Sequence, residues 1–211
     1  FCGIFGLCLF FDSYAFLVYL GFEPLIPIFT LHVCGQLELL SLKISKIISE
    51  SETEQEIKEK FRTINVKLQE LYRFIDEVQN DFKMLMEFNM KTSTFIVPCN
   101  AFQIVQEFRV NGNISIEFIS LLIASLIHFL TPCYFSDILM ESSERFRQAV
   151  YCCGWEKCRH KSIRKTVLLM LIRAGKPFSI STIFYFISLD TFSTMCRQAY
   201  AIFNVMNAAW T

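Results

Sequence analysis

The feature that most limits what this chain can fold into is the 19-residue run FISLLIASLIHFLTPCYFS at positions 118–136. The run contains no Asp, Glu, Lys or Arg. A helix needs about 20 apolar residues to cross a bilayer core of about 30 Å, so this run predicts a membrane span. The whole chain fits the same class, because 53% of its residues are hydrophobic and only 19% are charged. An average soluble domain has about 25% charged residues.

Three further apolar regions predict spans of their own. Residues 1–42 hold only three charged residues, all acidic, and prolines that favour a kink. Residues 92–106 are uncharged, although polar side chains weaken the signal. Residues 166–211 form the last apolar block, which the sequence RAGKP interrupts at 173–177. Together with 118–136, these regions predict an all-α membrane protein, a polytopic helical bundle with four spans whose last helix is split in two.

The distribution of basic residues gives these spans a direction. Seven Lys and Arg lie in residues 43–75 and seven more in residues 137–165, whereas residues 107–117 hold only Arg109. Because Lys and Arg concentrate in cytoplasmic loops, we expect both basic segments in the cytosol, and the 107–117 loop and the C-terminus outside. An Asn-x-Ser acceptor at Asn113 falls in that outside loop and is a candidate for glycosylation. The alternative is an unmodified turn near the membrane.

The basic segment at 43–75 also has a helical pattern. Its Glu and Lys residues are interspersed, while apolar side chains recur at helical spacing at Ile64, Leu68, Leu71 and Ile75. This pattern predicts an amphipathic helix, or a helical extension of a span, that lies in water.

Several classes of function find no support in the sequence. A net charge of zero argues against nucleic acid as a partner. The sequence has no G-x-S-x-G, H-E-x-x-H or phosphate-loop motif and its three His are scattered, so we expect neither an enzyme nor a cofactor. The nine cysteines lie mostly in apolar runs, and the cluster CCGWEKCRH at 152–160 lacks the paired spacing of structural zinc sites. We therefore expect no metal site.

Two stretches near the C-terminal end carry a family resemblance. The first, CYFSDILMESSERFRQAVYCCGWEK at 133–157, joins an aromatic-rich helix end to a Ser–Glu segment and then to Ala149, Tyr151 and Trp155. The second, at 164–206, contains basic residues before an apolar run, an R-x-x-K-P break, a Ser-Leu-x-x-Phe segment and a Tyr-x-x-Phe segment. Upstream, LHVCGQLELLSLKI at 31–44 is similar to the inner end of a fourth helix. With these markers nearly the whole chain resembles the insect odorant receptor family.

The resemblance implies a seven-helix receptor with a cytosolic N-terminus and an extracellular C-terminus. This chain would then hold helices four to seven, and helices one to three would precede Phe1, so we expect a fragment. The implied segments are the fourth helix with its lead-in and cytosolic extension (1–48), a cytosolic amphipathic segment (49–79), the fifth helix (80–106), an extracellular loop (107–113), the sixth helix (114–138), a cytosolic loop and anchor region (139–159), and the split seventh helix (160–211).

The resemblance also implies a function. It predicts a ligand-gated cation channel that detects small volatile ligands as a hetero-tetramer with a shared odorant co-receptor, in the plasma membrane of sensory neurons. Gustatory receptors share the architecture, but their usual ending, a Thr-Tyr pair followed by Gln-Phe, is missing here. The sequence is also compatible with a polytopic transporter, since transporters use broken helices with charges in mid-span, and with a non-functional truncated receptor copy.

Site residues follow from the same resemblance. The outer piece of the seventh helix lines the pore in this family, which implies pore or gate roles for Gln198, Asn204, Val205, Asn207, Ala208 and Ala209. The odorant pocket would draw on the fourth and sixth helices, with Tyr14, Phe16, Tyr19, Phe22, Phe118, Leu122 and Ile123. For these pocket residues, ordinary packing is the alternative role.

Four residues are candidates for contacts between subunits. The resemblance implies that Tyr151 and Trp155 supply interface area in the anchor region; a solvated loop is the alternative. Asp190 and Arg197 lie seven residues apart on the last helix, so they share a face but are too distant for direct contact. We expect each to pair with a neighbouring helix or subunit, and contact with permeating ions is the alternative.

Overall fold

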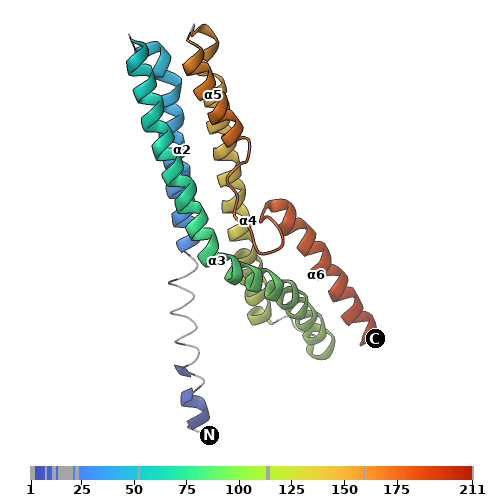
Figure 1. Cartoon of the computed structure of the whole chain (residues 1–211). Helices are drawn as coiled ribbons and strands as arrows, with labels where there is room; N and C mark the ends of the chain where they lie inside the picture. The colour runs from blue at the N-terminus through green and yellow to red at the C-terminus, as the bar shows by residue number, and fades with distance from the viewer. Residues whose placement is uncertain are drawn as a thin grey trace.

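The computed structural model describes residues 3–7, 9–10, 13, 21, 24–51, 53–112, 115–158 and 160–210. Its elements are α2 (Leu25–Glu50), α3 (Glu54–Asn111), α4 (Ile116–Tyr151), the short 3-10 helix η1 (Trp155–Lys157), α5 (Lys161–Ala174) and α6 (Leu189–Ala209). Figure 1 shows α2, α4 and α5 beside the first half of α3, while α6 extends away along the second half of α3. The helical bundle predicted from the sequence is confirmed.

The longest element, α3, joins two segments that the sequence predicted separately at 49–79 and 80–106. It is one helix of 58 residues, which at 1.5 Å per residue is about 87 Å long. Thr53 caps its start, because its Oγ1 accepts a hydrogen bond from the backbone N–H of Glu56 at 3.3 Å. Gly112 ends it in the left-handed conformation, with φ of 66°. A helix this long exceeds a bilayer core of about 30 Å, so much of α3 must project from the membrane.

The helix α4 is longer than predicted. The sequence placed a loop from residue 139 onward, but α4 continues to Tyr151. Its extension is stabilised on the outside by an ion pair between Glu141 and Arg145 at 2.7 Å. On the inside, its buried side chains recur at helical spacing: Leu139, Ser143, Phe146 and Val150. The polar Ser–Glu segment therefore forms the exposed face of a helix rather than a loop.

Most of the buried side chains gather in one core, which we call the main bundle. It packs α2 against the first half of α3, the second half of α4, and α5. Its fully buried members include Leu37, Ile44, Phe61, Phe146 and Val167. The predicted amphipathic segment supplies its apolar stripe to this core, through Ile64 and Leu68 with Leu71 and Ile75 at the edge.

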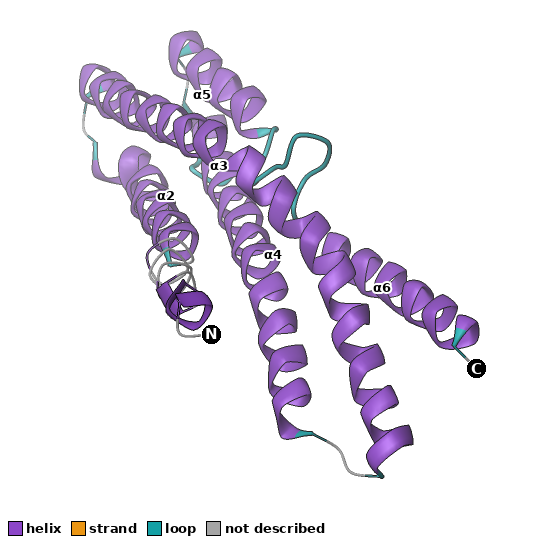
Figure 2. Ribbon diagram, turned by 90° about the horizontal axis from the view of Figure 1, so that it is seen from below, coloured by secondary structure: helices purple, strands orange, loops and turns teal. Residues whose placement is uncertain are grey.

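At the end of the molecule away from the main bundle, which we call the open end, the first half of α4 and α6 bury few side chains. Every buried residue of α4 lies at or after Phe129, and α6 buries only Ala199 among its residues. Figure 2 shows the first half of α4 and α6 diverging from the main bundle. By length and composition alone, α2 and α4 are the two helices of the described chain that are apolar enough to cross a membrane. The open end exposes large apolar side chains that water would not favour.

Candidate functional site

The break between α5 and α6 is a folded segment, which we call the linker (residues 175–188). Its two arms run antiparallel, with a bridge between Ser181 and Phe186 and a hydrogen bond from the N–H of Ile187 to the carbonyl of Ile180 at 2.9 Å. The sequence placed the second helical piece directly after RAGKP. That prediction is wrong for the linker, because Pro177 precedes a run of β-branched and aromatic residues that favours extended backbone.

The last helix, α6, begins where the linker ends. Ser188 caps it, since its Oγ accepts a hydrogen bond from the N–H of Thr191 at 3.2 Å. One side of α6 packs on the rest of the chain through Phe192, Met195 and Ala199. The opposite side forms a stripe, which we call the exposed stripe, at helical spacing: Asp190, Thr194, Arg197, Ala201, Asn204, Val205 and Ala208.

The predicted pore residues do not all lie on one side of α6. Gln198, Asn204, Val205, Ala208 and Ala209 are exposed. Asn207 is half-buried and turns toward α3, where its Oδ1 accepts a hydrogen bond from Nη2 of Arg109 at 3.0 Å. An edge-to-face contact between Phe102 and Trp210, with ring centroids 6.1 Å apart, ties the same end of α6 to α3.

Asp190 and Arg197, the two predicted contact charges, both lie on the exposed stripe. Within the described part of the chain neither forms an ion pair. The geometry of this single chain therefore directs both charges away from their own bundle.

The predicted odorant-pocket residues fall in two groups. Tyr14, Phe16, Tyr19 and Phe22 lie outside the described residues, as does the glycosylation candidate Asn113. On α4, Phe118 and Leu122 are half-buried and Ile123 is exposed.

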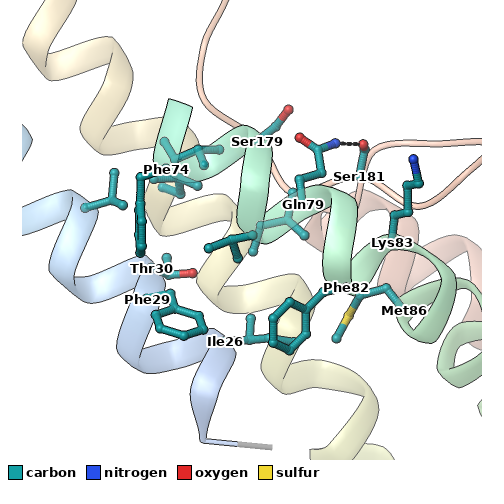
Figure 3. A pocket seen from close by; sticks show the side chains of 15 residues that line it. Ile26, Phe29, Thr30, Phe74, Gln79, Phe82, Lys83, Met86, Ser179 and Ser181 are labelled. Carbon is teal, nitrogen blue, oxygen red and sulfur yellow. Dashed lines mark hydrogen bonds between the residues drawn. The ribbon is translucent and has the colours of Figure 1, made fainter. Parts of the chain in front are cut away.

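The structure contains a separate apolar cavity that the sequence did not predict (Figure 3). It lies between α2, α3, α4 and the linker, and Phe29 and Phe82 form part of its wall in an edge-to-face pair. Gln79 on its rim donates a hydrogen bond to Oγ of Ser181, drawn as a dashed line in Figure 3. Its volume of about 40 Å³ is far below the roughly 300 Å³ of the smallest typical ligand pockets. In this arrangement it holds no odorant-sized molecule.

A buried carboxylate beneath the linker also escaped the sequence analysis. Glu87 of α3 is only 6% exposed, and its Oε1 lies 2.8 Å from Nζ of Lys91. The same ammonium lies 5.0 Å from the centre of the Phe184 ring at the tip of the linker. The sequence signal was the Glu–Lys spacing of four residues inside the predicted fifth helix, which permits this pairing.

Tyr72 of α3 and Arg173 of α5 join these two helices of the main bundle just before the linker begins. The guanidinium of Arg173 lies 4.5 Å above the Tyr72 ring, and the Tyr72 hydroxyl donates a hydrogen bond to the Arg173 carbonyl at 3.2 Å. Burial raises the pKa of the Tyr72 phenol above its usual value, and the positive charge of Arg173 opposes the rise. The hydroxyl therefore stays protonated and able to donate.

The far end of the main bundle carries an electrostatic contact between the starts of α3 and α5. Oε2 of Glu54 lies 2.8 Å from Nδ1 of His160, and its Oε1 lies 2.7 Å from Nζ of Lys58. The hydrogen bond from Lys58, with the nearby charge of His160, holds the pKa of the Glu54 carboxyl below its usual value. The contact is exposed, so its effect on stability is small.

The predicted interface residues Tyr151 and Trp155 differ in their surroundings. Tyr151 is 62% exposed, whereas Trp155 is half-buried against the main bundle. The indole Nε1 of Trp155 donates to the Tyr151 carbonyl at 3.0 Å. Nearby, burial raises the pKa of the Cys153 thiol to about 11, and the described residues contain no cluster of three metal-ligating side chains.

Comparisons with known proteins identify the family to which this chain is similar. The model of the family described as 7tm Odorant receptor matches residues 1–200. Among similar curated proteins, odorant receptor 13a of Drosophila melanogaster is 23% identical over 202 residues, covering 89% of this chain and 48% of that protein. Odorant receptor 19a of the same species is 30% identical over 105 residues, covering 47% of this chain and 27% of that protein. The chain thus spans about half the length, or less, of these relatives.

The fold agrees with solved structures of the same kind. The insect olfactory receptor OR5 from Machilis hrabei in complex with eugenol superposes with a TM-score of 0.71 at 16% identity, covering 85% of this chain and 45% of that one. A second structure of OR5 from Machilis hrabei gives a TM-score of 0.64 at 17% identity, covering 84% of this chain and 45% of that one. The family match covers nearly the whole chain, and its members are membrane receptors rather than enzymes. This chain therefore belongs to the insect odorant receptor family.

Proposed function

We propose that this chain forms part of a subunit of a ligand-gated cation channel that detects volatile chemicals. The subunit would assemble with an odorant co-receptor as a hetero-tetramer in the plasma membrane of sensory neurons. The observation that carries the proposal is the exposed stripe of α6. The helix buries one residue in its own chain and turns polar, charged and small side chains away from it.

The composition of the exposed stripe fits a helix that faces other subunits around a water-filled axis. Lipid would favour large apolar side chains, but the stripe carries Asp190, Thr194, Arg197 and Asn204. Near its C-terminal end, the stripe changes to Val205 and Ala208. A ring of such side chains from several subunits is an apolar constriction, which can gate by excluding water. We assign the gate to this end, with Asn204 and Gln198 toward the polar part of the pathway.

Asn207 has a different role in this proposal from the one expected at first. Its hydrogen bond to Arg109 holds the end of α6 against α3 of the same chain, so it positions the constriction rather than lining it. We assign Asp190 and Arg197 to contacts between α6 helices of adjacent subunits, because neither pairs within the described chain and both lie on the exposed stripe.

Odorant binding belongs to the open end of the bundle. The first half of α4 offers apolar side chains that its own chain leaves partly uncovered, including Phe118, Leu122 and Ile123. A small volatile ligand needs such an apolar wall with few directional contacts. OR5, whose described complex contains eugenol, supports this ligand class by similarity of fold.

The test is a recording from cells that express the coding sequence recovered from the full transcript, including whatever precedes Phe1, together with the co-receptor. We expect an odorant panel to evoke cation currents that cells with the co-receptor alone do not show. Reversing Asp190→Arg or Arg197→Asp singly should reduce the current, and the double reversal should restore part of it. A receptor that reaches the surface but conducts under no odorant, or that moves the odorant itself without ion flux, would contradict the proposal.

A further inference from the structure

Two serines of α4 form hydrogen bonds with backbone groups of the linker. Ser136 and Ser143 are buried, with 0% and 2% exposure, and their spacing of seven residues puts them on one face of α4. Oγ of Ser143 accepts a hydrogen bond from the N–H of Phe178 at 3.1 Å. Oγ of Ser136 accepts from the N–H of Ile180 at 3.3 Å and donates to the carbonyl of Ile187 at 2.7 Å.

The Ser136 hydroxyl therefore joins both arms of the linker to α4. Ile180 and Ile187 lie opposite one another, and the N–H of Ile187 donates to the Ile180 carbonyl at 2.9 Å. The next residue of α4, Asp137, also bonds this region: its Oδ1 accepts a hydrogen bond from the N–H of Leu189 at 3.4 Å. Leu189 is the first residue of α6, where backbone N–H groups have no partner within the helix.

These bonds differ from the usual behaviour of serine inside a helix. A helical hydroxyl commonly bonds a carbonyl three or four residues back in its own helix, as Ser41 does with the Leu37 carbonyl at 2.8 Å. Ser136 and Ser143 bond atoms of the linker instead. In apolar surroundings the linker amides have no water to replace these partners, so removing a hydroxyl leaves backbone groups buried and unpaired.

We propose that Ser136, with Asp137 and Ser143, forms a positioning clamp through which movement of α4 reaches α6. This inference rests on the proposed channel function of α6 for its consequence, although the clamp itself does not. A shift of α4 along its axis moves both linker arms and the first turn of α6 together, because each is hydrogen-bonded to this short stretch of α4. Without the clamp, movement of α4 reaches α6 only through apolar packing, such as that of Phe129 on Phe192, whose ring centroids are 5.2 Å apart.

The first test measures the clamp without relying on conduction. Backbone amide exchange is followed by mass spectrometry in the full-length receptor and in its Ser136→Ala and Ser41→Ala variants, purified in detergent. We expect peptides containing Ile180 to exchange faster in Ser136→Ala and to stay unchanged in Ser41→Ala, whose hydroxyl bonds only its own helix. Unchanged exchange near Ile180 in Ser136→Ala would overturn the clamp.

The second test measures coupling in cells with the co-receptor, with surface labelling to correct for receptor number. A hydrogen bond between membrane helices changes an equilibrium by roughly threefold on average. An interaction shifts the gating equilibrium only by the difference in its strength between the two states, so the loss of both bonds of Ser136 should change that equilibrium by up to about tenfold. We expect Ser136→Ala to lower the maximal odorant-evoked current per surface receptor, Ser143→Ala to lower it less, and Ser41→Ala to leave it unchanged. Faster exchange with an unaltered concentration–response curve would overturn the transmission of movement. A wild-type receptor without current would instead contradict the proposed function, and the exchange test would still decide the clamp.

Discussion

Replacing Leu37 of α2 by alanine tests whether the main bundle is the stable core of the molecule. Leu37 is 0% exposed and belongs to the main bundle. Truncating a fully buried leucine typically costs about 2–5 kcal/mol, because apolar contacts are lost and a cavity remains. For a chain of this size each kcal/mol lowers the melting temperature by about 2–4 °C, so Leu37→Ala should lower it by about 4–20 °C.

Leu39 provides a matched control on the same helix. Its side chain is 52% exposed, so Leu39→Ala leaves no closed cavity and should lower the melting temperature by no more than about 3 °C. Both variants are purified in detergent and melted while helical circular dichroism is followed. If Leu39→Ala destabilised the protein as much as Leu37→Ala, the packing described for α2 against α4 and α3 would be wrong.

Three further predictions concern groups outside that core. Because the pKa of Glu54 is lowered from its usual 4.5, the folded state gains a small stability that is present above that value and lost as the pH falls through the lowered pKa. An NMR titration should find that the Glu54 carboxyl titrates below 4.5, and a carboxyl that titrates at or above 4.5 would refute the contact. A maleimide at neutral pH should label the exposed Cys152 and spare the buried Cys153, whose pKa is about 11, as peptide mapping will show; equal labelling would place Cys153 at the surface. Arg109→Ala should free the end of α6 by removing the hydrogen bond to Asn207 and raise amide exchange in the last turns of the helix, whereas Arg109→Lys should preserve part of the protection.

The sequence predicted helices well where one face is apolar throughout. The RAGKP sequence at 173–177 was expected to interrupt the last apolar block, and α5 ends within it at Ala174, because Gly175 and then Pro177 follow. The predicted end of the sixth helix at residue 138 was wrong, because α4 continues to Tyr151 although the sequence there is polar. The Ser–Glu segment looks like a loop in isolation, and only its packing through Phe146 and Val150 shows that it is the outer face of α4.

The linker could not be predicted because its structure depends on distant residues. Its antiparallel arms are hydrogen-bonded to Ser136 and Ser143, which lie between about 35 and 51 residues away in sequence. The sequence likewise could not show which polar residues of α6 face the pore, because that depends on how the helix is oriented against α3. The family resemblance placed Asn207 with the pore because it lies on the outer piece of the seventh helix, whereas Arg109 of α3 turns it toward the bundle.

We propose that the exposed stripe of α6 faces the ion pathway, and cysteine accessibility tests that orientation. Val205 is 70% exposed on the stripe, and its neighbour Met206 is half-buried on the opposite side. In the receptor expressed with the co-receptor, a membrane-impermeant thiol reagent applied from outside should block odorant-evoked current in Val205→Cys, and leave Met206→Cys at the level of the wild type with its native cysteines. Block of Met206→Cys with no block of Val205→Cys would contradict this orientation, because it would show that the opposite face of α6 lines the pathway.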